Sequence, residues 1–416
     1  MSDPSSTVIE RILELHRSDP RPEGPSRRLL VSDPDDFGAI LHSTSFERTD
    51  FVQMLAGPGL LASDGDAWRE RRRIVQPAFP PRSPETYLRH IDWAMPAFTE
   101  RLEELARESR PTCLLEEMTR VVGRIIYRGV FGIETGPDDD RITRFEPMLH
   151  AAGELLLSLV VPGSRIDADL IDRVRATRAA ADEEIDWILD QRRAVPGDGV
   201  DDPLGRLLAA ERNGKMDAAS VRDEVRALIL ASTETSSNSL VWCLRLLHGH
   251  PDIRARTERD LDGGDQTRLD AAIFETLRLY PPVWSNERQA IANIEIANRR
   301  WTIGDRAVLS IYQLHRDPSL WPAPDRFDPD RFIDPDGGPW RPPHRFAYLP
   351  FGAGRHLCLG QNLALLEMNR ILLAILTRFR IEFDDPHAIE PMLGVVIRVS
   401  TPVIVRIARR DRRDAP

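Results

Sequence analysis

The feature that most constrains the fold is a long stretch, from about Asp217 to Leu247, that has the residue pattern of one helix. It opens with an aspartate in the N-cap position and is followed by Gly249 and Pro251, which are typical of a helix end. Its middle, ALILASTETSSNSLVWCL, is almost free of charge. Because a helix that is apolar on all sides must be buried, we expect this helix to cross the core.

The rest of the pattern predicts a mainly α-helical chain with small β-sheets. Apolar residues spaced three and four apart predict helices in most of the N-terminal two thirds, and β-branched alternation predicts strands after residue 290. The expected helices cover residues 10–16, 93–107, 167–193, 270–280 and 363–379. The expected strands cover residues 291–296 and 301–311, and residues 395–407 are expected to form a terminal hairpin.

Composition narrows the class of protein. The chain has 416 residues, of which 41% are hydrophobic and 29% charged, and this excludes global disorder. Its length is compatible with two or three average domains or with one large enzyme. The formal net charge of −10 argues against a nucleic-acid partner, because surfaces that bind phosphate are usually basic.

Cysteine usage and hydropathy indicate the compartment. The three cysteines, Cys113, Cys243 and Cys358, are far apart and include no C-x-x-C pair, so a disulfide scaffold and a four-cysteine zinc site are excluded. No apolar run approaches the roughly 20 residues of a membrane span. The first residues, MSDPSSTVIE, lack the features of a secretory signal. We therefore expect a cytoplasmic protein with no membrane anchor.

The segment PFGAGRHLCLG, residues 350–360, carries the most chemical information. Its glycines allow the backbone to approach a flat or anionic group closely. Cys358 precedes an expected helix, where free N–H groups and the helix dipole favour a thiolate, and Arg355 adds a fixed positive charge. The alternative is a free cysteine in a glycine-rich turn.

This segment resembles the haem-binding loop of the cytochrome P-450 family, F-x-x-G-x-R-x-C-x-G, at Phe351, Gly354, Arg355, Cys358 and Gly360. Four other segments resemble motifs of that family and occur in the family's order. They are Trp68 to Arg72 (the propionate-binding helix), Ala231 to Ser236 (the oxygen-activating stretch), Glu275 to Arg278 (E-x-x-R) and Phe327 to Phe332 (the meander). The resemblance covers about residues 10–407. It implies one domain over residues 1–416, with haem buried between the central helix and the Cys loop.

The resemblance also implies the cofactor and its contacts. The cofactor would be haem b (heme b, iron protoporphyrin IX), with the Cys358 thiolate as the axial iron ligand. The haem propionates would need positive partners. The implied cofactor-binding set is Cys358, Arg355, Arg288, Arg72, Trp68, Phe351, Gly352 and Gly360. For Arg72 the alternative is a solvated basic face, since it lies in the run from Arg69 to Arg73.

Glu234 and Thr235 lie in the apolar middle of the central helix, where a carboxylate is costly unless it is paired or used. The resemblance implies that they are the catalytic pair that relays protons during oxygen activation. The alternative is a Ser/Thr cluster that bonds to the preceding helical turn. Ser232 stands where the family usually has glycine, which puts the standard groove geometry in doubt.

The E-x-x-R motif is weak evidence by itself, because it starts at Glu14, Glu70, Glu104, Glu117, Glu275 and Glu367. Only Glu275 lies between the central helix and the meander. We expect Glu275, Arg278 and Arg331 to form a buried structural network rather than a catalytic one.

The function implied is a haem-thiolate monooxygenase of the bacterial type that hydroxylates or epoxidises an apolar or amphipathic small molecule. We expect electrons from an external ferredoxin and ferredoxin reductase, with Arg69, Arg71 and Arg73 docking the acidic partner. The expected pocket residues include Phe51, Met54, Leu60, Leu228, Val283, Trp284 and Met392. The alternatives are atypical oxidation such as coupling or desaturation, a non-enzymatic haem protein and, remotely, a cysteine hydrolase.

Overall fold

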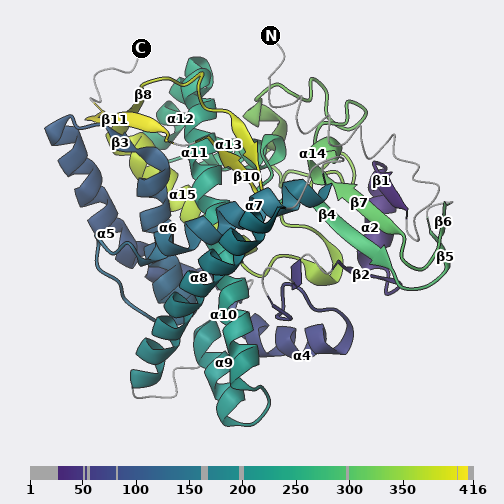
Figure 1. Ribbon diagram of the computed structural model, residues 1–416. Coiled ribbons are helices and arrows are strands. Elements are labelled where there is room, and N and C mark those ends of the chain that lie inside the picture. Colours follow the sequence, from purple (N-terminus) through teal and green to yellow (C-terminus); the bar gives the residue numbers. More distant parts are fainter. Residues whose placement is uncertain are drawn as a thin grey trace.

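The computed structural model describes residues 27–49, 52–53, 57–80, 83–160, 167–195, 201–296, 299–400 and 402–410. The expected helix at 10–16 and the expected pocket residues Phe51 and Met54 lie outside this part of the chain. The described part is mainly helical with small sheets, as expected. Most of the long helices gather on one side of the molecule, and the largest sheet lies on the other (Figure 1).

The helical elements, including the short 3-10 helices η1 to η4, follow one another along the whole described chain. They are α2 (Pro34–His42), α4 (Gly65–Val75), η1 (Gln76–Ala78), α5 (Pro84–Glu108), α6 (Leu114–Phe131), η2 (Arg141–Phe145), α7 (Glu146–Val160), α8 (Ala168–Ala194), α9 (Pro203–Arg212), α10 (Ala218–Ser232), α11 (Glu234–Gly249), α12 (Pro251–Asp262), α13 (Thr267–Leu279), α14 (Ile311–Leu314), η3 (Pro329–Phe332), η4 (Gly354–His356) and α15 (Gln361–Arg378).

The strands form four small sheets. They are β1 (Arg28–Val31), β2 (Phe46–Arg48), β3 (Thr112–Cys113), β4 (Ser285–Ala290), β5 (Ile294–Ile296), β6 (Arg299–Trp301), β7 (Arg306–Ser310), β8 (Phe379–Phe383), β9 (Pro391–Leu393), β10 (Ile397–Val399) and β11 (Ile404–Arg409). The sheet orders are β1-β7-β4-β2, β3-β11-β8, β9-β10 and β5-β6. In the first sheet, antiparallel pairing of β2 with β4 places Arg48 directly opposite Arg288.

The central stretch is two helices, not the single helix that the sequence predicts. α10 begins after the N-cap Asp217, whose carboxylate accepts the Ser220 N–H at 2.7 Å, and ends at Ser232. α11 begins at Glu234 and ends at Gly249. The physical reason is hydroxyl competition at the junction. The Thr235 hydroxyl donates to the Ala231 carbonyl at 3.1 Å and the Ser237 hydroxyl to the Thr233 carbonyl at 2.9 Å, and such bonds bend helices.

The expected terminal hairpin over 395–407 is wrong. β10 pairs with β9, while β11 pairs with β3 and β8 in another sheet. The two strands separate because they pack against different helices. β10 is buried along its length beside α11, whereas β11 alternates buried and exposed residues and packs on α5.

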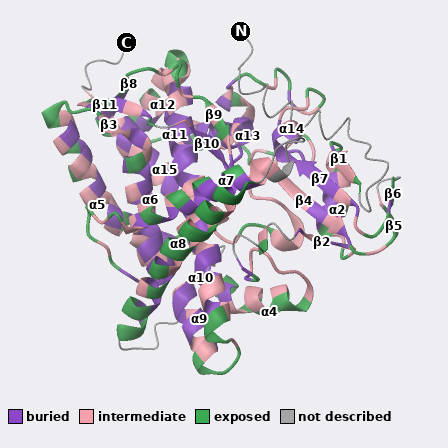
Figure 2. Cartoon of the chain, viewed as in Figure 1, coloured by how far each residue is buried: buried purple, intermediate pink, exposed green. Residues whose placement is uncertain are grey.

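The described residues contain four apolar clusters, of which two are large. Figure 2 shows where the buried residues lie. The larger one joins α5, α6, α8, α10, α11, α13 and α15, with fully buried side chains such as Phe131 and Leu240. The smaller one lies between α2 and the first sheet around Phe37 and Trp301. α11 is buried over most of its length, so the central stretch does cross the core as expected.

Candidate functional site

The loop that carries Cys358 is shaped by glycines and closed by its own backbone. Gly352 and Gly354 have φ of +74° and +69°, and a Cβ on Gly354 would lie 2.8 Å from the Leu41 carbonyl oxygen. The Cys358 N–H donates to the Phe351 carbonyl at 3.1 Å, and α15 starts three residues later. A Cβ added at Gly352 or Gly360 would meet no protein atom within 4 Å. The loop therefore has an open side.

Cys358 has solvent-exposed surface, although enough protein surrounds the thiol for burial to affect its pKa. Burial raises the pKa of the thiol, while the Arg72 charge and the backbone N–H groups of Gly360 and Gln361 act in the opposite direction. The sequence predicts that the helix terminus and Arg355 favour a thiolate; in the structure the N–H groups and Arg72 act in that direction, but burial has the larger and opposite effect. The N–H donors and the cation are nevertheless arranged to stabilise a thiolate once a metal ion binds it.

Positive side chains from α4, from β4 and from the Cys loop itself gather at this site. Arg72 of α4 donates to the Leu357 carbonyl at 3.0 Å, and its guanidinium lies 5.8 Å from the Trp68 ring. Arg355 donates to the Ser43 carbonyl at 2.8 Å, and its buried Nε has no hydrogen-bond partner in the described chain. Arg288 of β4 is buried and donates to the Glu287 carbonyl at 2.9 Å. The structure thus brings together three arginines that the sequence predicts.

A fourth arginine, Arg48 of β2, belongs to the same cluster and was missed by the sequence analysis as a cofactor contact. Burial and the nearby charges of Arg288 and Arg72 lower its pKa to about 9. Arg48 and Arg288 are opposite each other across two strands, and like charges in that position are destabilising. No local motif marks Arg48, because its place depends on the strand register.

Asp64 is the carboxylate that the structure places within this arginine cluster. Its Oδ2 accepts the backbone N–H of Arg48 at 2.7 Å, and its Oδ1 lies 2.8 Å from Nε2 of His356 in the Cys loop. The His356 ring in turn packs against Trp68, with ring centroids 4.7 Å apart. One carboxylate does not balance four guanidinium groups, so the site fits a ligand that brings negative charge, as haem propionates would.

Glu234 and Thr235, the expected catalytic pair, lie at the junction of α10 and α11. The Glu234 carboxylate is mostly buried and forms an ion pair with Arg398 of β10, while its Oε2 has no hydrogen-bond partner in the described chain. The Thr235 hydroxyl donates to the carbonyl of Ala231. Ala231 is exposed, although most residues in the helical turns just before it are buried. Ser232 bonds weakly to the Ile229 carbonyl at 3.4 Å, so its hydroxyl is engaged within its own helix.

A buried hydrogen bond joins the central helix to the helix that follows the Cys loop, in addition to their shared apolar core. The Ser236 hydroxyl donates to Oε1 of Glu367 on α15 at 2.6 Å. Burial raises the pKa of Glu367 to about 8, and its Oε2 has no hydrogen-bond partner among the described residues. The sequence marks Glu367 only as one of the E-x-x-R matches, which does not reveal this contact.

The expected network of Glu275, Arg278 and Arg331 is confirmed. Arg278 donates through Nε and Nη2 to the Glu275 carboxylate at 2.7 and 2.8 Å, and Arg331 Nε reaches Glu275 Oε1 at 3.1 Å. His315 extends the network to the segment before the Cys loop, since its ring lies 3.1 Å from the Arg278 carbonyl and accepts the Leu349 N–H at 2.8 Å.

The expected docking surface of Arg69, Arg71 and Arg73 is only partly available. Arg71 turns inward to the buried Glu224 of α10, with Nη1 and Oε1 2.7 Å apart. Glu224 also accepts the Leu60 N–H, so α10, α4 and the turn before α4 meet at this carboxylate. Arg71 is therefore removed from the docking hypothesis, because a buried carboxylate has to be paired.

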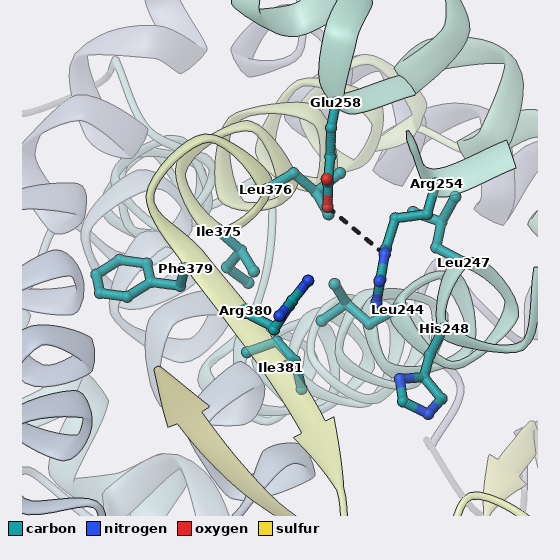
Figure 3. A pocket seen from close by; sticks show the side chains of 10 residues that line it. All are labelled: Leu244, Leu247, His248, Arg254, Glu258, Ile375, Leu376, Phe379, Arg380 and Ile381. Carbon is teal, nitrogen blue, oxygen red and sulfur yellow. Dashed lines mark ion pairs between the residues drawn. The ribbon is translucent and has the colours of Figure 1, made fainter. Parts of the chain in front are cut away.

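A separate small cavity of ≈ 20 Å³ lies among α11, α12, α15 and β8 (Figure 3). It is lined mainly by apolar side chains, with an ion pair of 3.6 Å between Arg254 and Glu258 at its edge. None of the candidate site residues lines it, so it is not the site described above. Of the expected pocket residues, Trp284 is buried in a minor core with Tyr312 and Ile397, and Met392 is 49% exposed.

Comparisons with known proteins agree with this geometry. The cytochrome P-450 family model matches residues 24–405. A "Cyclooctat-9-en-7-ol 5-monooxygenase" from Streptomyces melanosporofaciens is 30% identical over 396 residues, covering 86% of this chain and 81% of that protein. A "Cyclooctatin synthase" from the same organism is 31% identical over 377 residues, covering 82% of this chain and 77% of that protein.

Solved structures show the same fold. A six-coordinated cytochrome P-450 from Thermus thermophilus matches with a TM-score of 0.72 and 25% identity, covering 97% of this chain and 99% of that chain. The haem domain of a cytochrome P-450DA mutant matches with a TM-score of 0.78 over 99% of this chain and 94% of that chain, and at 23% identity it supports the fold alone. Within the described residues, no helix is both long and apolar enough to span a bilayer. The chain belongs to the cytochrome P-450 family and is a haem-dependent monooxygenase of that family.

Proposed function

We propose that this monooxygenase is a single-domain protein that holds haem b, with the Cys358 thiolate as the axial iron ligand. The observation that carries this proposal is an exposed thiol beside a cluster of arginines that, among the described residues, shares the carboxylate of Asp64. The Gly360 and Gln361 N–H groups would stabilise the sulfur, and the open side of Gly352 and Gly360 would admit a flat ring.

The propionates would be held by Arg72, Arg288 and Arg355, with Arg48 added to the set that the sequence predicts. Burial lowers the pKa of both Arg72 and Arg288, so each would gain from a nearby anion. Trp68 would orient the site through its contact with His356, and Phe351 would pack beside the loop. When bound, the haem supplies one-electron and oxygen chemistry.

Glu234 and Thr235 would supply the protons that the net reaction consumes. A monooxygenation puts one oxygen atom of O2 into the substrate and reduces the other to water, with two electrons and two protons. Burial raises the pKa of Glu234, which favours a carboxyl group that can take up and release a proton. The Thr235 hydroxyl, bonded to the exposed Ala231 segment, would pass that proton onward.

For the substrate we propose an apolar or amphipathic small molecule with a cyclic hydrocarbon skeleton. The name of the Streptomyces relative at 30% identity, a cyclooctat-9-en-7-ol monooxygenase, supports this class. Electrons would come from an external ferredoxin and ferredoxin reductase, with the exposed Arg73 as a candidate contact in place of Arg71.

The test is the reduced carbon-monoxide difference spectrum of protein expressed with haem supply. We expect the long-wavelength band of thiolate-ligated haem for the wild type and for the control Cys113→Ser, and loss of that band for Cys358→His. A wild-type band at short wavelength would contradict thiolate ligation by Cys358. Extraction of the haem as its pyridine adduct would identify the b form. An oxygen-isotope label in the product distinguishes oxygen insertion from coupling or desaturation.

A further inference from the structure

Arg398 is a buried cation that neither the motifs nor the comparisons assign. It lies on β10, and its Nε forms an ion pair with Oε1 of Glu234 at the start of α11. The Arg398 and Glu234 side chains are only 9% and 12% exposed. Two ions this deep in a protein are costly to desolvate, so their pairing in this place calls for a reason.

Asn238 determines the register that puts Arg398 opposite Glu234. It lies one helical turn after Glu234, and its side-chain amide donates to the Glu234 carbonyl at 2.9 Å. Its amide oxygen accepts the backbone N–H of Val399 at 2.9 Å. One buried side chain thus ties α11 to β10 directly beside the ion pair, so Arg398 cannot slide along the helix without breaking these bonds.

The ion pair is incomplete. Oε2 of Glu234 and Nη2 of Arg398 are both buried, and neither has a hydrogen-bond partner among the described residues. Unsatisfied buried polar atoms are rare in native proteins, and a catalytic role is one explanation for them. A carboxylate held by one oxygen can leave its cation when it takes up a proton, because the attraction between the charges is then lost.

We propose that Arg398 is a positioning residue for proton delivery, which holds ionised Glu234 against β10 and releases it toward Thr235 when Glu234 is protonated. This inference rests on the proton-carrying role proposed above for Glu234. Asn238 keeps the backbone at this point in place while the carboxyl group moves. The residue that carries the proton is thereby controlled by a strand near the end of the chain.

The other charged groups around the pair support this arrangement. Glu146 and His150 face the ion pair from α7. The Glu234 charge contributes to raising the pKa of Glu146, and the Arg398 charge contributes to lowering the pKa of His150. Glu116 of α6 acts on Glu146, and Glu367 of α15 lies behind Ser236. Arg398 is thus the neighbouring charge that opposes the effect of burial on Glu234.

The direction of the effect follows from these charges. Burial raises the pKa of Glu234, and Arg398 lowers it. If Arg398 loses its charge, Glu234 stays protonated to a higher pH. An opposite charge at this range shifts a carboxyl pKa by about 1 to 3 units, so we expect Arg398→Gln to move the Glu234 midpoint upward by about one pH unit or more.

The experiment uses haem-loaded protein and compares the wild type with Arg398→Gln, Arg398→Lys, Asn238→Ala and Glu234→Gln. The control is Arg406→Gln, at an exposed residue of β11. Two readouts are followed against pH. One is the infrared carbonyl band of protonated Glu234, identified by its absence in Glu234→Gln. The other is the rate at which hydrogen peroxide oxidises the phenol guaiacol, in which two guaiacol molecules each give up one electron and the peroxide becomes water.

We expect Arg398→Gln to raise the pH midpoints of both readouts by about one unit or more, and Asn238→Ala to shift them in the same direction. Arg398→Lys should restore most of the wild-type value. The control Arg406→Gln should change neither midpoint. If Glu234→Gln abolishes the pH dependence but Arg398→Gln and Asn238→Ala leave both midpoints in place, the role of Arg398 is overturned and the proposed function stands. If Glu234→Gln keeps the wild-type pH profile, the role proposed for Glu234 is itself overturned.

Discussion

Two buried ion clusters, one around Glu275 and one around Glu234, are built differently. In the cluster around Glu275, the two carboxylate oxygens accept from Nε and Nη2 on one edge of the Arg278 guanidinium. Oε1 also accepts from Arg331 and from the backbone N–H of Asp328 at 2.9 Å. Arg278 also donates to the carbonyl groups of His315 and Pro324, each at 2.7 Å. In the cluster around Glu234, one ion pair with Arg398 leaves buried atoms on both partners unbonded.

This difference separates a structural role from a functional one. A fully hydrogen-bonded network in a low-dielectric interior is rigid, and it suits a region that has to hold the loop before Cys358 in one place. A half-bonded carboxylate retains the ability to change its partner or its protonation state. The two regions share the same residue types, so what distinguishes them is the number of partners around each carboxylate.

Glu275→Gln is the variant for which we expect the largest loss of stability, so it tests the structural role of this cluster most directly. Because the change leaves the Arg278 and Arg331 charges buried without a counter-ion, we expect a loss of about 3 to 5 kcal/mol of unfolding free energy and poor haem incorporation. The control is Glu70→Gln, which alters an exposed E-x-x-R match and should stay within about 0.5 kcal/mol. Urea denaturation measures the unfolding free energy of each variant, and the haem-to-protein ratio measures its haem incorporation. Equal effects of the two variants would contradict the assignment of Glu275 as a structural centre.

A further buried carboxylate, Glu224, extends the comparison through its partner Arg71. Arg71→Ala removes a charged hydrogen bond from a group that is 1% exposed, and we expect a loss of about 1.5 to 3 kcal/mol. The matched control is Arg69→Ala on the same helix, whose pairing with Asp66 is exposed and worth at most about 1 kcal/mol. Thermal unfolding of the two variants side by side should separate them, and similar melting temperatures would argue against the inward role of Arg71.

Glu367 differs from these carboxylates because no cation pairs with it among the described residues. Its pKa is raised from an ordinary value of 4.5 to about 8, so between these values the folded state holds a proton that the unfolded state has lost. Stability from this group is therefore present at low pH and is lost as pH rises through that window, with a slope of at most about 1.4 kcal/mol per pH unit. We expect Glu367→Gln to reduce this slope in urea titrations at about pH 5.5 and about pH 7.5. An unchanged slope would show that Glu367 is ionised in the fold.

The smallest effect on stability is expected for the incomplete ion pair. Arg398→Gln should cost about 1 kcal/mol or less, because Glu234 can take up a proton when its cation is removed. Because the two side chains are in direct contact, the double variant Glu234→Gln with Arg398→Gln should not be additive, and a double-mutant cycle by urea denaturation would measure their coupling energy. A loss as large as that of Glu275→Gln would remove the distinction between the two clusters.

Much of the fold could be predicted from local pattern. The helices α8 and α15 appear within one or two residues of their expected bounds, since N-cap aspartates, glycines and apolar spacing act over short distances. The break at Thr233 could not be predicted from hydrophobicity, because it depends on which hydroxyl groups bond back to the preceding turn. The terminal hairpin was wrong because strand pairing depends on distant partners.

The sequence by itself determined the family, the order of its motifs and the chemical groups around Cys358, because these reside in short segments whose residue types are visible without a structure. Only the tertiary structure decided which charges meet. Strand register puts Arg48 opposite Arg288, the Asn238 bonds put Arg398 beside Glu234, and the approach of α15 to α11 puts Glu367 on Ser236. Each of these pairs joins elements far apart in the chain, where the geometry of packing rather than local spacing sets the partner.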